Sequence, residues 1–400
     1  MKRDEWPLTI LVIAVGVAYW NLLLPSPLQP YIAFDLGISL SKAAQLVTAS
    51  AAAAVVTLLI YGLIGTKWTA KYVIMVGLAF LTVGSALALM TSNYTLLLGI
   101  RVFNGVADGC IYAASWVAIA DYLKKERYGF GIRMLLVATA LAGVIGLPLV
   151  NEWASSGNWQ SAFKWFTVAG GIATVISVVG LWGAKEYPHE EEAIGGFRVI
   201  LKDPHLNRLL VANVAVAVSW FGALTFLGGF ITKTYLPTTF QVNVFYAAAG
   251  GAFVVGSFIN WPNLGGQRWI ALASGVLAIP LVIIFFAFTG GFWTTLLIAC
   301  IFAVFRAPGI AVLETWLLEA AEQKAARVPA IVCVDLGPAI GTLVAASIGG
   351  IVLSQTAYVG IGSVFSAAAI VSLGFLIIAF RAHADTEKQT SAQRAKAEAL

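Results

Sequence analysis

The stretch IRVFNGVADG, residues 100–109, places two opposite charges inside a long apolar run. Arg101 and Asp108 are the only charged residues between Leu96 and Ala120, and a bilayer is crossed by about 20 helical residues. A charged side chain at the bilayer centre costs about 3 kcal/mol or more, so both groups should face protein or a water-filled cavity. The stretch therefore predicts a membrane helix packed among other helices.

The composition of the whole chain points to the same class. Hydrophobic residues make up 60% of the 400 positions and charged residues only 11%, against about 45–50% and about 25% in ordinary soluble domains. The N-terminal MKRDEW leads straight into an apolar run, so we expect no cleavable signal peptide. The three cysteines, Cys110, Cys300 and Cys333, fall inside predicted helices and are expected to be packing residues.

The apolar runs predict an all-α integral membrane protein with twelve transmembrane helices in two six-helix bundles. The predicted spans are 8–31, 43–65, 72–91, 95–121, 129–151, 161–183, 207–232, 240–261, 269–289, 292–318, 328–353 and 358–380. The longest polar break separates the sixth span from the seventh. We therefore expect an N-terminal bundle (1–184), a linker (185–206), a C-terminal bundle (207–381) and a loose or weakly helical tail (382–400).

Lysine and arginine residues are strongly biased to one set of loops. Of the 24 such residues, only Lys42, Lys164 and Lys233 fall in loops on the second side, and Arg101 and Arg306 fall inside spans. The positive-inside rule then places both termini in the cytoplasm, and we expect a cell (inner or plasma) membrane. The net charge of +5 reflects this topology, and we expect no nucleic-acid partner.

The polar residues of the fourth predicted span fall on one side of a helix. At 100° per residue, a single stripe contains Arg101, Asn104, Gly105, Asp108, Tyr112 and Ser115. Arg101 and Asp108 are two turns apart, about 10 Å along the axis, so they are not an ideal direct pair. One interpretation is a buried ion pair that fixes helix packing. The interpretation we favour is a protonatable carboxylate whose ionisation is set by burial and by a movable cation.

The second half carries its own charges inside predicted spans. Arg306 and Glu314 lie in the tenth span, and Asp335 lies about two turns into the eleventh. Glu314 is either a second protonation site or an acid buried by packing. Asp335 is either a protonation site or an anchor for the start of its helix. The ends of other spans carry Asp35, Asp121 and Glu152, for which solvated or capping roles are expected.

Other classes of chemistry find little support. No His, Cys, Asp and Glu cluster has metal-ligand spacing, and neither a P-loop nor a dinucleotide fingerprint follows a strand. Intramembrane histidine is absent from the predicted spans, and no nucleophile and base occur together at helical spacing. We therefore expect no cofactor, no metal and no enzymatic activity.

Several motifs occur in an order typical of one transporter family. They are LQPYIAFDLGISLSKAAQLVTASAAAAVV (28–56), RVFNGVADG (101–109), ADYLKKERYGFGI (120–132) and GNWQSAFKWFTVAGG (157–171). Through them, essentially the whole chain resembles the major facilitator superfamily, in particular its drug:proton-antiporter-like branch. The resemblance implies alternating access, with two six-helix halves rocking around a central site.

Two motifs depart from the family pattern. In GLIGTKWTAK (62–71), Thr66 stands where the gating Asp is usual and Thr69 replaces a glycine, so the cytoplasmic latch must differ or be weaker. The gate candidates are Gly62, Lys67, Lys71, Asp121 and Arg127. The fifth-span motif AGVIGLPLVNEW (142–153) keeps two glycines and a proline but lacks the Gly-Pro dipeptide and the closing glycine pair, which weakens the antiporter assignment.

The resemblance also implies that spans one, four, seven and ten line the central site. The cavity candidates are Tyr19, Trp20, Asn21, Asn104, Tyr112, Trp220, Phe221, Arg306 and Trp316. The proton-coupling candidates are Asp108, Arg101, Asp335 and Glu314. An aromatic, nearly charge-balanced lining favours a small amphipathic organic solute over a polyanion.

These observations predict a secondary active transporter that exports such a solute in exchange for protons, working as a monomer in the bilayer. The alternative is a proton symporter or a facilitator for a metabolite such as a sugar, organic acid or amino acid. The direction of proton movement linked to the substrate separates the two.

Overall fold

The structure is a computed structural model that describes residues 6–64, 68–124, 127–184, 200, 202–259, 264–288, 290–322 and 327–398. These residues form helices and no β-strand. The helices of the first half are α1 (Trp6–Leu23), α2 (Pro25–Asp35), α3 (Leu40–Ile64), α4 (Ala70–Ala88), α5 (Tyr94–Tyr122), α6 (Tyr128–Leu141), the π-helical turn η3 (Ala142–Gly146), α7 (Leu147–Ser155) and α8 (Trp159–Trp182). Those of the second half are α10 (Pro204–Tyr235), α11 (Thr239–Ser257), α12 (Leu264–Ala287), α13 (Phe292–Glu322) and α14 (Arg327–Glu398).

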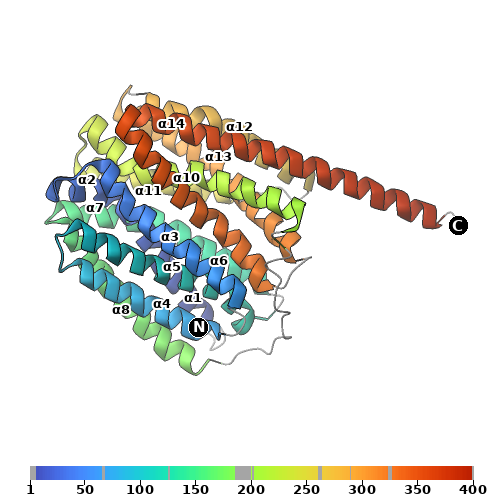
Figure 1. The fold of residues 1–400 in the computed structure, drawn as a ribbon, viewed down its shortest axis with the longest axis horizontal. Helices are drawn as coiled ribbons and strands as arrows, with labels where there is room; N and C mark the ends of the chain where they lie inside the picture. Colours follow the sequence, from blue (N-terminus) through green and yellow to red (C-terminus); the bar gives the residue numbers. More distant parts are fainter. Residues whose placement is uncertain are drawn as a thin grey trace.

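The described residues contain eleven helical segments long and apolar enough to cross a membrane. The last, Ile331–Arg381, has 51 residues and would measure about 75 Å as one straight helix, against a hydrocarbon core of about 30 Å. It is interrupted at Ala357, whose φ of 56° and ψ of −158° are not helical. Figure 1 shows α14 reversing direction there, so two helices meet at this residue. The count of twelve spans and the cytoplasmic location of both termini stay predictions.

The first span is broken into α1 and α2 by prolines. Pro25, Pro27 and Pro30 follow the end of α1 closely. A proline has no N–H to donate to the carbonyl four residues before it, so Pro25 leaves the Asn21 carbonyl without its helical partner and Pro30 does the same for Ser26. The end of the bundle at which α2 lies is called the α2 end below; Figure 1 shows α7 at the same end.

Close contact between α5 and α3 depends on two glycines spaced four residues apart. A Cβ on Gly105 would lie 2.0 Å from the Ser50 carbonyl oxygen, and one on Gly109 would lie 2.7 Å from Thr57 Cβ. Small residues at this spacing let membrane helices approach backbone to backbone. Asp108 precedes Gly109 directly, so this contact also determines how close α3 lies to its carboxylate.

The fifth predicted span contains a π-helical turn at its glycine-rich motif. η3 lies between α6 and α7, and a Cβ on Gly146 would lie 2.6 Å from the Trp20 ring. On its other side, the backbone nitrogen of Val144 would lie 3.1 Å from a Cβ on Gly250 in α11. π-Turns often occur at functional sites, and this one brings the first half against the second.

Two large apolar clusters form the cores of the halves. One is built from α1 to α8 and also includes Val332 and Leu336 of α14, and the other is built mainly from α10 to α14. The most enclosed helix is α10, in which 89% of the most apolar stretch is buried. The helical backbone of α14 continues to Glu398. It therefore runs through most of the tail (382–400) that was expected to be loose or weakly helical. The tail is rich in Ala, Gln, Lys, Arg and Glu, which favour helix.

Replacing Gly105 by alanine should destabilise the fold. The added Cβ would overlap the Ser50 carbonyl, and overpacking of this kind costs about 1–3 kcal/mol. Thermal unfolding in detergent, followed by tryptophan fluorescence, should show a lower midpoint for Gly105→Ala. Gly99→Ala is the matched control, because Gly99 lies on the same helix and a Cβ there has no neighbour within 4 Å. Equal midpoints for the two variants would contradict the close α3–α5 contact.

Candidate functional site

Asn21 of α1 joins the two charges of α5. Its Nδ2 donates to both carboxylate oxygens of Asp108, at 3.0 Å to Oδ1 and 2.8 Å to Oδ2. Its Oδ1 accepts from Arg101 Nη1 at 2.9 Å, and its backbone carbonyl accepts from Arg101 Nη2 at 3.3 Å. Arg101 and Asp108, two turns apart, are therefore linked through one side-chain amide.

The network formed by Arg101, Asn21 and Asp108 is closed off from solvent. All three side chains are at most 1% exposed. Asn104 Nδ2 reaches Asn21 Oδ1 at 3.5 Å, and Ser50 Oγ of α3 reaches Asp108 Oδ2 at 3.5 Å. The stripe expected on α5 does face the protein interior, while Val102 on the opposite side is 45% exposed.

With Arg101 protonated and Asp108 ionised, the network carries no net charge. Two of its buried polar atoms have no hydrogen-bond partner among the described residues. The Arg101 cation balances the Asp108 anion, which limits the cost of burying either charge. Arg101 Nε and Asn104 Oδ1 are buried without a hydrogen-bond partner among the described residues. A proton on Asp108 would leave the arginine charge uncompensated, so the protonation state of the carboxyl and the position of the guanidinium are physically coupled.

Aromatic rings continue from this network to the boundary between the halves. Tyr19 of α1 makes edge-to-face contacts with Tyr112 of α5, at 6.4 Å between ring centroids, and with Phe221 of α10, at 6.3 Å. Such pairs contribute about 0.5–1.5 kcal/mol beyond their buried area. The Tyr112 hydroxyl is buried without a hydrogen-bond partner in the described part of the chain.

Two small cavities lie between the halves. The larger, of about 50 Å³, is lined by aromatic, aliphatic and small residues from both: Tyr19, Leu23, Thr139, Ala140, Gly143, Leu147, Trp220, Leu224, Leu227, Tyr246, Ala249, Gly250 and Phe253. The Trp220 ring stacks on Phe253 with the centroids 4.6 Å apart. A dry cavity of about 150 Å³ holds one benzene molecule, so this space is too small for an organic substrate in the conformation observed.

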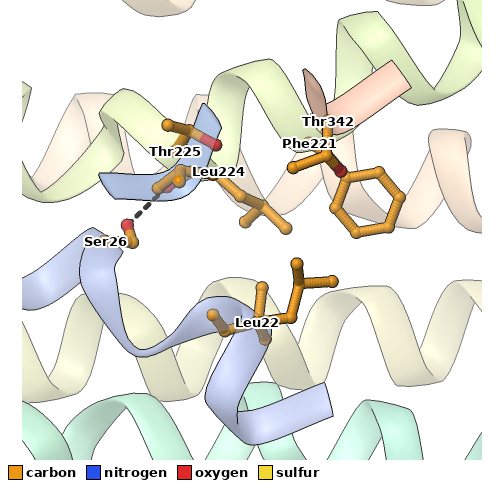
Figure 2. Close-up of a pocket in the computed structure, with 8 residues that line it drawn as sticks. Leu22, Ser26, Phe221, Leu224, Thr225 and Thr342 are labelled. Atoms are coloured by element: carbon orange, nitrogen blue, oxygen red, sulfur yellow. Dashed lines mark hydrogen bonds between the residues drawn. The ribbon is translucent and has the colours of Figure 1, made fainter. Parts of the chain in front are cut away.

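The smaller cavity, of about 10 Å³, has room for about one water molecule. Figure 2 shows Leu22 and Ser26 of the first span facing Phe221, Leu224 and Thr225 of α10 and Thr342 of α14. Ser26 closes it by donating a hydrogen bond to the Leu224 carbonyl.

Hydrogen bonds join the halves at the α2 end. Gln29 Nε2 donates to the Thr225 carbonyl at 2.8 Å, and Ser41 donates to the Gly350 carbonyl. In a separate group, Asn151 of α7 donates to Asn243 Oδ1 of α11 at 2.7 Å. Asn243 in turn donates to Glu152 Oε2 at 2.8 Å. These contacts close the α2 end of the boundary.

The charged residues of the second half are arranged differently from those of the first. Arg306 is 2% exposed and donates from Nη2 to the Val216 carbonyl at 3.1 Å, while its Nε is buried without a partner among the described residues. Glu314 and Asp335 are partly buried and close enough to interact electrostatically. Asp335 also interacts with Tyr112, and Glu314 with Tyr19. No amide connects these groups as Asn21 does in the first half, within the described residues.

Two tryptophans expected at the cavity pack elsewhere. Trp20 contacts Trp153 and Phe166 inside the first half, with centroids 5.7 Å and 5.5 Å away. Trp316 donates to Gln267 at 3.0 Å and packs against Phe380, so it joins α13 to α12 and α14. The positions of Trp20 and Trp316 around their helices do not predict these partners, because an aromatic ring can pack on either side of a membrane helix.

The predicted gate residues are only partly placed. Lys67 lies outside the described residues. Gly62 is buried in α3, Lys71 lies over the Tyr72 ring, and Arg127 lies over the Phe130 ring. Asp121 is close enough to Tyr61 for an electrostatic interaction. Their gating role stays a prediction.

Other site residues were not expected from the sequence. Ser50 of α3 and Tyr246 and Phe253 of α11 belong to spans that the pattern of charges did not single out. The only signal for Ser50 is its place in TASAAAA (48–54), a run of small residues that permits close approach by another helix.

Comparisons with known proteins agree on one family. The model of the family described as Major Facilitator Superfamily matches residues 11–264. The chain is 21% identical over 328 residues to the uncharacterized MFS-type transporter YwfA of Bacillus subtilis (strain 168), covering 79% of this chain and 77% of that protein. It is 24% identical over 236 residues to a chloramphenicol resistance protein of Streptomyces lividans, covering 57% of this chain and 59% of that protein.

A solved structure shares the fold. It is the crystal structure of a bacterial homologue of the human lysosomal transporter Spinster, in an inward-facing and unoccupied conformation. The TM-score is 0.71 at 13% identity, over 95% of this chain and 98% of that one.

Removing Arg101 should destabilise the protein because the Asp108 carboxylate would be left buried without its balancing charge. Breaking a buried pair by removing one partner costs about 3–5 kcal/mol, so Arg101→Met should lower the midpoint of thermal unfolding in detergent. Adding Asp108→Asn should recover much of the loss, since both charges are then gone. Lys164→Met, which removes an exposed cation, is the control. Additive effects of Arg101→Met and Asp108→Asn would show that the two charges are not coupled.

Proposed function

The chain belongs to the Major Facilitator Superfamily, and from this premise we propose that it is a proton-coupled exporter of small amphipathic organic solutes. Secondary transport by a multi-pass membrane protein is what its relatives have in common. The observation that carries the proposal further is the buried network in which Asn21 joins Arg101 to Asp108.

Asp108 is the proposed coupling carboxylate. It is buried beside a cation that depends on it for charge balance, and the Asn21 amide donates to both of its oxygens. A proton on either oxygen would turn it into a hydroxyl that donates a hydrogen bond and is a weaker acceptor, so the charge-assisted bonds from the amide would weaken. Binding and release of a proton would thus change the contact between α1 and α5. Glu314 and Asp335 are proposed as the second-half protonation sites.

The conformation observed fits one state of an alternating-access cycle. The hydrogen bonds from Gln29 and Ser26 of α2 and from Asn151 of α7 close the boundary at the α2 end. With both termini in the cytoplasm, as the lysine and arginine distribution predicts, this end faces outward. The solute would enter from the cytoplasm and leave once these contacts open.

The lining of the larger cavity supports an amphipathic solute. Tyr19, Trp220 and Phe253 offer ring faces, Thr139 offers a hydroxyl, and formal charges are absent from its lining. Sites of this composition bury an apolar body and orient it with few polar contacts. The chloramphenicol resistance protein among the relatives favours export over uptake of a metabolite.

Transport in proteoliposomes under an imposed pH gradient tests the coupling. Wild type, Asp108→Asn and the control Asp35→Asn would be compared with a lipophilic dye cation and a panel of sugars, organic acids and amino acids. Asp35 is an exposed carboxylate that accepts from Trp159 outside the network. We expect dye movement against the proton gradient in wild type and Asp35→Asn, and its loss in Asp108→Asn. Normal proton-driven flux in Asp108→Asn would remove this carboxyl from the coupling role, and flux of a metabolite alone would favour a symporter or facilitator.

Gly143 tests whether the larger cavity is the solute site. It lines the cavity, and a Cβ there would only touch Leu23 Cδ1, at 3.9 Å. Gly143→Ala should therefore retain transport, whereas Gly143→Leu should reduce flux of larger solutes several-fold and spare smaller ones. Initial rates across a series of solutes of increasing size measure this, with Gly99→Leu as control. A uniform loss for every solute would indicate a general defect instead of a narrowed site.

A further inference from the structure

The two parts of the first span bind to different halves of the molecule. In α1, Asn21 binds Arg101 and Asp108 of the first half. In α2, Ser26 and Gln29 donate to carbonyls of α10 in the second half. The break between α1 and α2 therefore lies between the buried charges and the contacts that close the α2 end.

Two prolines of this break each leave a backbone carbonyl without its helical donor. The Asn21 carbonyl, which Pro25 deprives of its helical donor, accepts from Arg101 Nη2 at 3.3 Å. The Ser26 carbonyl, deprived by Pro30, lies against α10 so closely that a Cβ on Gly228 would be 2.3 Å away. Within about one and a half turns, the chain thus changes partner from the arginine of the first half to the backbone of the second.

We propose that Asn21 is a positioning residue that couples the charge state of Asp108 to the opening of the contact between α2 and α10. This inference rests on the proposed function, in which Asp108 carries the transported proton. The Asn21 amide accepts from Arg101 and donates to both Asp108 oxygens, and the bonds to Asp108 are strongest while the carboxyl is ionised. When Asp108 gains a proton, the bonds from Asn21 weaken and the new hydroxyl needs an acceptor, so Asn21 and the end of α1 shift, and α2 follows through Pro25.

The groups that face Asp108 are consistent with control through Asn21. On α5 these are Arg101, Cys110 and Tyr112. α3 contributes the Ser50 hydroxyl, and α1 contributes Asn21 and, through Tyr112, the ring of Tyr19. Asp335 of α14 interacts with Tyr112, and Glu314 of α13 interacts with Tyr19. Each of these two carboxyl groups is thus related to Asp108 through a tyrosine ring. Tyr19 and Asn21 both belong to the broken span, and of these two Asn21 is the one that hydrogen-bonds to Asp108.

Distance measurements across the contact between α2 and α10 test the proposal. Spin labels at Phe34→Cys and Lys233→Cys report on it, because both side chains are exposed near the ends of α2 and α10; Cys110, Cys300 and Cys333 are first replaced by alanine. The distance distribution would be recorded in lipid nanodiscs as a function of pH. We expect a pH-dependent longer distance in the otherwise wild-type protein, and its loss in both Asp108→Asn and Asn21→Ala.

Two further variants separate positioning from stability. Asn213→Ala is the matched control, because Asn213 is also a buried asparagine, 1% exposed, but donates to the Val334 carbonyl in the second half; it should respond to pH like wild type. Pro25→Ala restores an N–H that can compete for the Asn21 carbonyl and leaves the network side chains in place, so it should weaken the response even if Asn21→Ala does not fold.

The outcomes distinguish this inference from the proposed function. A wild-type pH response in Asn21→Ala, or in Pro25→Ala when Asn21→Ala is unfolded, overturns the role of Asn21 and leaves proton coupling intact. A wild-type response in Asp108→Asn overturns the coupling role of Asp108 itself. Distances independent of pH in the parent protein, together with proton-driven flux that depends on Asp108, would show that the contact between α2 and α10 is not what the proton controls.

Discussion

The hydrogen bonds of a single amide determine how the centre of the first half can be built. A guanidinium and a carboxylate inside a membrane helix are tolerable only if each is compensated. Two turns of helix separate Arg101 from Asp108, so their charges balance but their hydrogen bonds go through a third group. Asn21 supplies an acceptor to Arg101 and a donor to Asp108 from a neighbouring helix. α1 must therefore cross α5 at this level, and the register of the two helices is fixed.

The helices around the network are shaped to reach it. Without a hydrophobic force between helices in lipid, packing depends on close contact and on polar links. Gly105 and Gly109 let α3 approach until Ser50 meets Asp108. Pro25 leaves the Asn21 carbonyl available to Arg101. The residues that look weakest as helix formers, glycine and proline, are the ones that allow the charges to be buried.

The sequence was sufficient for the parts of this arrangement that follow from repeated patterns. Apolar runs of the right length predicted the helical membrane class, and the polar stripe on α5 predicted a buried interior face, which α5 does present. Contacts between spans could not be predicted, because nothing in the pattern of α1 says which residue meets Arg101. Asn21 was expected at a solute cavity, and its side chain is instead fully engaged by Arg101 and Asp108. Trp316 was also placed at the centre, whereas its partners Gln267 and Phe380 are recognisable only once α12 and α14 are packed against it.

The enclosure of α10 has a consequence for how the protein is made. Its sequence is as apolar as that of a helix that faces lipid, yet 89% of its most apolar stretch is covered by protein. Hydropathy is sufficient for a segment to enter the bilayer on its own, so α10 can be inserted during synthesis while lipid chains surround it. Those lipids must then be displaced as α14 and the first span assemble around it. The apolar surface of α10 thus has two roles: it lets the segment enter the bilayer, and it later packs against α14 and the first span. Substitutions on this surface should therefore affect insertion and assembly separately from transport.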